Sequence, residues 1–445
     1  MVGLPWGRPL NRMSAMAELS TDFRARLKDD LWHRVRPMTG RSPHEQHRSA
    51  TPLELLYDLV YVIAFGAAAQ QLAHLLGDGH VLAGIGAYLF AIFGVSWAWM
   101  NFTWFSSAYG NDDALFRAST IAQMVGVVIF TFGLPVSFEA AAHGESPNNA
   151  LMVVGYVIMR VPLIALWLRA AREDQARRRT AVAYAITIAL AQVGWVLTTV
   201  IPLPALVIVV ALVLLAAAEM IAPVVIEHRI GRAPWNAGHI AERFSLLTLI
   251  TLGEVVASTT LAVGALIDAQ GLSPAAVTIA AAGIVLAAAL WWAYFLIPSR
   301  TLLERWPERV WAWRYAHLPM FGAIAAVGAG LHIAALAVEH EEGSPLVVAL
   351  ATAVPVAIVI LVVYATWSLL VRSFDIAHFP MLLVCLLPLI AAVVVAAVAG
   401  SHGDLDVGVL VAIIALIALS SIVEVVVHER VGYAHTIRAL EASPE

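Results

Sequence analysis

The chain has 445 residues, of which 61% are hydrophobic and 13% are charged, and its mean hydropathy is +0.82. Soluble domains carry about 25% charged residues, so this composition excludes an ordinary soluble domain and indicates a membrane protein. The net charge of −5 gives no sign of nucleic-acid binding, and the single cysteine, Cys385, excludes an intrachain disulfide.

A polar segment, residues 1–50, precedes the first apolar stretch, and we expect it to be cytoplasmic. Apolar residues recur every four positions from Leu19 to Val35, with arginines and a lysine between them. This spacing predicts an amphipathic helix on the membrane surface, and an ordinary cytoplasmic helix or a frayed tail is the alternative.

Twelve apolar stretches are long enough to cross a bilayer, which takes about 20 residues. The stretch 180–226 is too long for one crossing, and the prolines of "IPLP" divide it into two. The sequence therefore predicts an all-α, polytopic membrane domain over residues 51–430, followed by a cytoplasmic tail, 431–445. The predicted spans are 53–76, 81–105, 115–142, 150–168, 180–200, 203–226, 240–266, 275–297, 315–338, 346–370, 379–399 and 407–427.

The charges of the connections support this number of spans. Connections after odd-numbered spans, such as "HGESPNN" and "DAQGLS", contain no Lys or Arg, whereas those after even-numbered spans, such as "RAAREDQARRR" and "EHRIGR", hold nearly all of them. Basic connections stay in the cytoplasm, so both termini are expected there, in a multi-pass membrane protein. One span more or fewer would break the alternation.

A weak internal similarity predicts a duplication into two parallel six-helix halves, 51–230 and 235–430. Spans 2 and 8 each end with a Trp-x-x-Phe pair, followed by a cytoplasmic loop and an arginine that opens the next span. Such halves are related by an axis normal to the membrane. Aromatic residues are common at membrane interfaces, so chance similarity stays open. The matched residues are Trp99, Phe102 and Arg117 in the first half and Trp292, Phe295 and Arg314 in the second.

The first span carries two carboxylates one helical turn apart, within "TPLELLYDLVYVIAF". A charged side chain inside a bilayer costs several kcal/mol unless it is paired or hydrated. The run from Thr51 to Glu54 has the pattern of a capping box, which predicts that Glu54 closes the start of the helix. Asp58 lies about 6 Å deeper. Its expected partners are Arg117 and Arg314, in either a structural ion pair or a functional site.

Span 7 carries the second charged group, within "HIAERFSLLTLITLGEVV". His239, Glu242 and Arg243 lie in its first turns, where His239 and Arg243 either extend to the interface or belong to a site. Glu254 lies about 18 Å beyond Glu242, near the middle of the bilayer, and must be protonated, paired or hydrated there. Gly253 beside it predicts the close approach of another helix.

Two further ionisable residues are predicted to lie within the membrane. Arg160 in span 4 stays charged, and Glu254 or Glu219 is its expected anion. His317 follows Arg314 by three residues and is expected either to join the carboxylates of span 1 or to be a hydrogen-bonded core residue.

The sequence contains no H-E-x-x-H motif, no phosphate-binding G-x-x-x-x-G-K-[ST] motif and no nucleophile elbow. It therefore predicts no catalytic residue, metal site or cofactor, and an enzymatic activity is not favoured. On span 9, Gly322, Ala326 and Gly330 form a stripe of small residues that predicts close helix packing.

The two acidic motifs resemble those of the bacterial low temperature requirement A (LtrA) family of multi-pass membrane proteins. The resemblance extends over about residues 48–430. It implies a membrane fold and marks the same carboxylates, but it implies no particular substrate or reaction. Leu56 replaces an aromatic residue of the family pattern, and Val255 stands where serine is common. The matching residues are Thr51, Glu54, Leu55, Tyr57, Asp58, Leu59, Val60, Tyr61 and Val62 in span 1 and His239, Glu242, Arg243, Leu246, Leu252, Gly253 and Glu254 in span 7.

Three functions remain open. The first is a transporter or channel for a small solute or ion, with a polar route between spans 1, 3, 4, 7 and 9 and with Asp58 and Glu254 binding a proton or cation. The second is a membrane-embedded, lipid-modifying enzyme that uses His239 and Glu242 as an acid–base pair. The third is a structural or stress-adaptation protein whose charge pairs only stabilise packing. The expected partners are the lipid bilayer and a small solute, cation or proton. The candidate binding residues are Asp58, Glu254, Glu54, Glu242, His239, Arg117, Arg160, Arg314 and His317.

Overall fold

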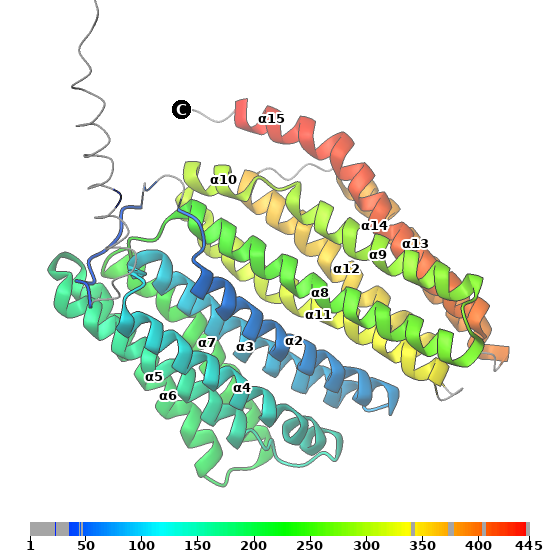
Figure 1. The fold of residues 1–445 in the computed structure, drawn as a ribbon, viewed down its shortest axis with the longest axis horizontal. Helices are drawn as coiled ribbons and strands as arrows, with labels where there is room; N and C mark the ends of the chain where they lie inside the picture. Colours follow the sequence, from blue (N-terminus) through cyan, green and yellow to red (C-terminus); the bar gives the residue numbers. More distant parts are fainter. Residues whose placement is uncertain are drawn as a thin grey trace, which may run out of the picture.

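The computed structural model describes Phe23 and residues 35–441, except for 44, 46–47, 340–342, 373–377 and 403–405. The amphipathic segment predicted for residues 19–35 lies almost wholly outside the described residues. In the described part every regular element is helical, and 12 helices are long and apolar enough to cross a membrane (Figure 1). These helices are α2 (Pro52–Gly77), α3 (Val81–Tyr109), α4 (Ala114–Ala142), α5 (Ala150–Glu173), α6 (Arg178–Val200), α7 (Ala205–Arg229), α8 (Ala237–Gln270), α9 (Pro274–Phe295), α11 (Val310–Glu339), α12 (Pro345–Val371), α13 (His378–His402) and α14 (Val407–Val427).

The predicted all-α membrane fold with twelve spans is confirmed. The "IPLP" turn separates α6 from α7, as expected from its two prolines. Two short helices add to the predicted spans: α10 (Ser299–Arg305) before α11, and α15 (Tyr433–Glu441) near the end of the chain. A π-helical turn, His428–Gly432, joins α14 to α15.

Several helices begin at a polar capping residue. Asp113, Asn236, Ser273 and Asp406 each accept a hydrogen bond from the backbone N–H three residues further on. Such caps satisfy backbone donors that have no partner within the helix. Asn236 also donates to the backbone oxygens of Pro43 and Glu45, both at 3.0 Å, so it attaches the start of α8 to the segment before α2.

Helices α2, α8 and α11 contact one another in the middle of the bundle (Figure 1). Of the twelve spans, α11 is the most buried, whereas α7 and α13 are the least buried. Charged side chains on the inner faces of α2, α8 and α11 are therefore surrounded by protein. The end of the bundle at which α2 begins and α7 ends carries most of the arginines of the connections, and is here called the basic end.

The small residues of α11 allow close helix packing. A Cβ on Gly330 would lie 2.7 Å from the backbone carbonyl carbon of Ala351 in α12, and one on Gly322 would lie 3.0 Å from Ile92 in α3. Larger side chains would separate these helices, so the predicted packing role of the stripe is confirmed.

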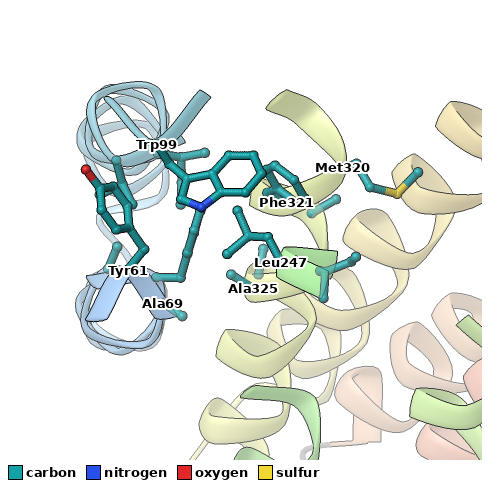
Figure 2. Packing of buried hydrophobic residues seen from close by; sticks show 14 of the residues in the cluster. Tyr61, Ala69, Trp99, Leu247, Met320, Phe321 and Ala325 are labelled. Atoms are coloured by element: carbon teal, nitrogen blue, oxygen red, sulfur yellow. The ribbon is translucent and has the colours of Figure 1, made fainter. Parts of the chain in front are cut away.

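Aromatic packing fixes the position of Trp99 on α3. Its ring centroid lies 4.9 Å from that of Phe244 on α8 and 5.8 Å from that of Phe321 on α11. Figure 2 shows the Trp99 ring lying between α2 and α11 among other buried residues, including Tyr61 and Leu247. Such edge-to-face contacts hold the ring in one orientation, so the direction of its N–H group is fixed as well.

The two predicted halves have the same order of helix neighbours, α2–α4–α5–α6–α7 in one and α8–α11–α12–α13–α14 in the other. Two of the matched residues nevertheless differ in environment. Trp99 is fully buried, whereas Trp292 is half exposed and donates to Glu429 at 3.0 Å. The division into two halves stays a prediction.

Candidate functional site

The start of α2 is closed by a capping box. Glu54 N–H donates to Thr51 Oγ1 at 3.3 Å, and Thr51 N–H donates to Glu54 Oε2 at 2.9 Å. The predicted capping role of Glu54 is thus confirmed. Its other carboxylate oxygen, Oε1, accepts from Ser106 Oγ on α3 at 2.6 Å and lies 3.0 Å from Arg243 Nη1 on α8.

Asp58 is held one turn deeper by two donors from different helices. Its Oδ1 accepts from Arg243 Nη2 at 2.5 Å and from Trp99 Nε1 at 2.6 Å. The relative exposure of Asp58 and Arg243 is 0%. His239, also fully buried, places its Nε2 3.4 Å from Glu54. We call Glu54, Asp58, His239 and Arg243 the α2–α8 charge cluster.

The cluster contains two carboxylates but only one arginine. Its net charge is therefore zero only when one further proton is bound, on His239 or on a carboxyl group. His239 Nε2 and Glu54 are close enough to share that proton, and His239 Nδ1 has no hydrogen-bond partner in the described structure.

The arginines predicted as partners of Asp58 lie elsewhere, so that prediction is wrong. Arg117 forms an ion pair with Asp112 at 2.6 Å, and both side chains are about one-third exposed at the basic end. Arg314 is fully buried but contacts no carboxylate within ion-pair distance in the described residues, and none of its guanidinium nitrogens has a hydrogen-bond partner there.

Four aromatic rings surround Arg314 instead. A guanidinium is attracted to the face of an aromatic ring, so these rings stabilise the buried cation. The distances from Arg314 Cζ to the ring centroids are 5.1 Å for Trp97, 4.7 Å for Trp104, 5.5 Å for Trp311 and 5.9 Å for Tyr315.

His317 does not join the carboxylates of α2. Its Nε2 lies 3.0 Å from Tyr294 Oη, and its Nδ1 lies 2.8 Å from the backbone oxygen of Trp313. The ring also packs against Phe244, with the centroids 4.9 Å apart. Both ring nitrogens thus have hydrogen-bond partners. Of the two predictions for His317, the structure supports a hydrogen-bonded core histidine.

Two ionisable side chains in the first turns of α8 point into the bundle and not to the interface. His239 and Arg243 are fully buried, so neither extends to the interface. Glu242 accepts from the backbone N–H of Ala50 at 3.1 Å, whereas the hydrogen bond of the His239 ring is to Glu54. The proposed acid–base pair of His239 and Glu242 is not formed, because the two side chains have different partners.

Arg160 forms a buried ion pair with Glu219, one of its two predicted anions. Arg160 Nη2 lies 2.5 Å from Glu219 Oε2, and Tyr156 Oη donates to the same oxygen at 2.8 Å. Trp195 Nε1 donates to the other carboxylate oxygen at 2.9 Å. With this many donors the Glu219 charge is compensated, so the site fits a structural pair.

Glu254 is partly buried between α2, α8 and α11. Ser258 Oγ donates a hydrogen bond to Glu254 Oε1 at 3.3 Å. In the described residues, no cationic side chain forms an ion pair with Glu254. A Cβ on Gly66 would lie 2.6 Å from Glu254 Oε2, and one on Gly328 would lie 2.7 Å from its Cγ. Gly253 is exposed and a Cβ there would have no neighbour within 4 Å, so its predicted role in close packing is wrong.

Comparison with known protein families identifies the family to which the chain belongs. The family of bacterial low temperature requirement A (LtrA) proteins matches residues 49–423. The chain belongs to the LtrA family. The matched region includes the α2–α8 charge cluster and Glu254, which confirms the resemblance seen in the two acidic motifs. Among curated proteins, the comparison found no match.

In this LtrA-family chain the charge cluster adjoins a cavity of about 270 Å³ at the basic end. Glu54 and Thr51 line the cavity together with Arg41, Arg48 and Asp112. Burial and the nearby charge of Arg41 lower the pKa of Arg48 to about 10, which leaves it positively charged at neutral pH. Glu54 is thus the member of the cluster that lines this cavity.

Sequence reasoning missed several residues of the site. Trp99 and Ser106 are the donors from α3, and neither has a motif that identifies it as a site residue. The spacing of the charged residues is the signal in the sequence that points to the cluster. The two acids of one helix, Glu54 and Asp58, are four residues apart, and so are His239 and Arg243 on another helix. In the described residues, no group of three or more His, Cys, Asp or Glu side chains has a geometry that could hold a metal ion.

Proposed function

We propose that this protein is a transporter or channel of the bacterial cell membrane that moves a small solute or ion, and that membrane-embedded carboxylates bind its proton or cation. The observation that carries the proposal is Glu254. An ionised carboxylate without a counter-ion is costly inside a membrane protein, and a bound proton or cation removes that cost. Gly66 of α2 and Gly328 of α11 allow both helices to approach the carboxylate closely.

The α2–α8 charge cluster supports the same proposal from the basic end. Glu54 joins the cluster to the adjoining cavity, and a proton bound between Glu54 and His239 would exchange through that cavity. Asp58 is a weaker candidate for ion binding than Glu254, because Arg243 already neutralises it. We also propose that the basic end faces the cytoplasm, since basic connections are retained there.

The test is transport by purified protein in liposomes, with a pH-sensitive dye inside and a panel of monovalent cations outside. Glu254→Gln removes the carboxylate at nearly constant size and should reduce proton or cation flux at least tenfold. Asp268→Asn is the matched control, because Asp268 lies on the same helix, is exposed near its far end and should not affect flux. Wild-type flux in folded Glu254→Gln protein would overturn the proposal.

A structural role without transport is the second candidate, and the Asp58–Arg243 pair favours it. Both side chains have 0% exposure, and the cavities that the structure shows at the basic end are not lined by either of them. A buried pair of this kind can hold α2 against α8 without taking part in transport. This candidate predicts that no ion panel gives flux above that of empty liposomes.

A further inference from the structure

A second buried acid–histidine pair lies far from the α2–α8 charge cluster in sequence, at the end of α14. Glu424 has 1% relative exposure and His428 has 6%. His428 Nδ1 lies 3.2 Å from Glu424 Oε1, at the i,i+4 spacing that places two side chains on one helix face. Neither residue belongs to the two acidic motifs.

Each member of the pair keeps one polar atom without a partner. Glu424 Oε2 and His428 Nε2 are buried and have no hydrogen-bond partner in the described structure, and the same is true of Ser421 Oγ one turn earlier. Buried polar atoms in folded proteins are nearly always hydrogen-bonded. Three such atoms lie within two helical turns, which is a local excess of unsatisfied polar groups.

In the described residues, neighbouring helices place weak acids and an indole ring beside the pair. Tyr364 of α12 and Cys385 of α13 lie beside Glu424, and the Tyr364 ring centroid is 5.4 Å from that of His428. On α9, Trp292 contacts the exposed Glu429 rather than the pair. In the described residues no lysine or arginine forms an ion pair with Glu424, and His428 is its ion-pair partner there.

The backbone around His428 is adapted to the ring. The π-helical turn His428–Gly432 begins at this residue, and such turns occur frequently at functional sites. A Cβ on Gly432 would lie 2.7 Å from His428 Cδ2, so the absence of a side chain there makes room for the imidazole.

We propose that Glu424 and His428 form a proton-binding site. With zero net charge the pair holds one exchangeable proton, either on the carboxyl group or as the second proton of the imidazole. Release of that proton leaves a buried charge of −1. A monovalent cation can balance this charge in place of the proton. The inference is independent of the transport proposal, because proton binding is measured on the protein itself.

The experiment is infrared difference spectroscopy of wild-type protein in lipid while the pH of the buffer is changed. Protonated carboxyl groups have a C=O stretching band that carboxylates lack. Glu424→Gln should remove one titrating carboxyl band, and His428→Asn should shift the pH midpoint of that band by about one unit or more because the partner is lost. Glu429→Gln is the control, since Glu429 is exposed and should leave the band in place.

Circular dichroism and gel filtration establish that each variant is folded. If Glu424→Gln does not fold, Glu424→Asp retains a carboxyl group but moves it away from His428, and the midpoint should shift. An unchanged set of carboxyl bands in folded Glu424→Gln would overturn the proposal, and so would an unchanged midpoint in both His428→Asn and Glu424→Asp.

Discussion

Arg243 of α8 donates to Asp58 of α2 over 2.5 Å, and the same guanidinium lies 3.0 Å from Glu54. One cation thus joins two acids of the neighbouring helix, in a region without solvent exposure. Removal of one partner from a buried pair leaves an uncompensated charge, whereas replacement of both partners by apolar residues is much less costly. Three of the four predictions concern this cluster or the carboxylate of Glu254.

The first prediction concerns the loss of the cation. Arg243→Met should destabilise the protein by about 3–5 kcal/mol, because two buried carboxylates lose their counter-ion. The double variant Asp58→Leu/Arg243→Met should recover part of this loss. Thermal unfolding in detergent, followed by tryptophan fluorescence, measures both. Arg229→Met, which removes an exposed arginine, should change the unfolding temperature little. Equal stability of Arg243→Met and Arg229→Met would contradict the assigned role.

The second prediction tests whether the two charges of the buried pair can be exchanged. Asp58→Arg and Arg243→Asp should each reduce the yield of folded protein strongly, and the two changes together should restore it, because the swapped pair keeps the net charge of the cluster. The yield is measured by gel filtration of the detergent extract. Failure of the double variant to improve on the single ones would show that the orientation of the pair matters as well as its charge.

The third prediction uses three glycines near Glu254. Gly66→Ala should displace the Glu254 carboxylate and alter ion binding, with only a small loss of stability, because the contacted atom is the end of a flexible side chain. Gly328→Ala should cost more, since its Cβ would meet Cγ of Glu254 at 2.7 Å and the Glu254 backbone oxygen at 3.3 Å. Gly253→Ala should be neutral or stabilising by up to about 1 kcal/mol, as expected for an unhindered helix position. Thermal unfolding of the three variants gives the ranking, and a destabilised Gly253→Ala would contradict it.

The fourth prediction concerns acid sensitivity at the start of α4. Burial raises the pKa of Asp113, but hydrogen bonds from Arg169 and from the backbone N–H groups of Phe116 and Arg36 outweigh it and lower the pKa to about 2. Because the folded pKa lies below the unfolded value, the stabilisation is present above about pH 4 and is lost as the pH falls toward 2. Between these limits wild type should lose about 2 kcal/mol more than Asp113→Asn. Unfolding curves at several pH values measure the difference, and parallel curves would contradict it.

The number of spans could be predicted from the sequence because hydropathy and the charges of the connections indicate it independently. The capping role of Glu54 was also predictable, since Thr51 and Glu54 are local in sequence. The predicted depth of Arg160 in the membrane allowed two carboxylate partners, Glu219 and Glu254. In the structure the partner is Glu219.

The partners of Asp58 could not be predicted, because hydropathy sets the depth of a residue but not the rotation of its helix. Spans that are apolar on every face give no periodicity from which to orient them. Arg314 has a depth similar to that of Arg243 but points toward aromatic rings, and only the packing of Trp99 and Phe244 shows which arginine reaches Asp58. For the same reason Gly253, adjacent to Glu254 in sequence, faces away from the helices that contact the carboxylate.

The contacts between Glu54 and His239 and between Asp58 and Arg243 both join residues 185 positions apart. The caps of α2 and α8, Thr51 and Asn236, have the same separation, 236 − 51 = 185. Equivalent turns of two helices thus meet with opposite charge. A polypeptide cut between α7 and α8 would accordingly rejoin as a heterodimer of unlike fragments, whereas two copies of the amino-terminal fragment would oppose acid to acid.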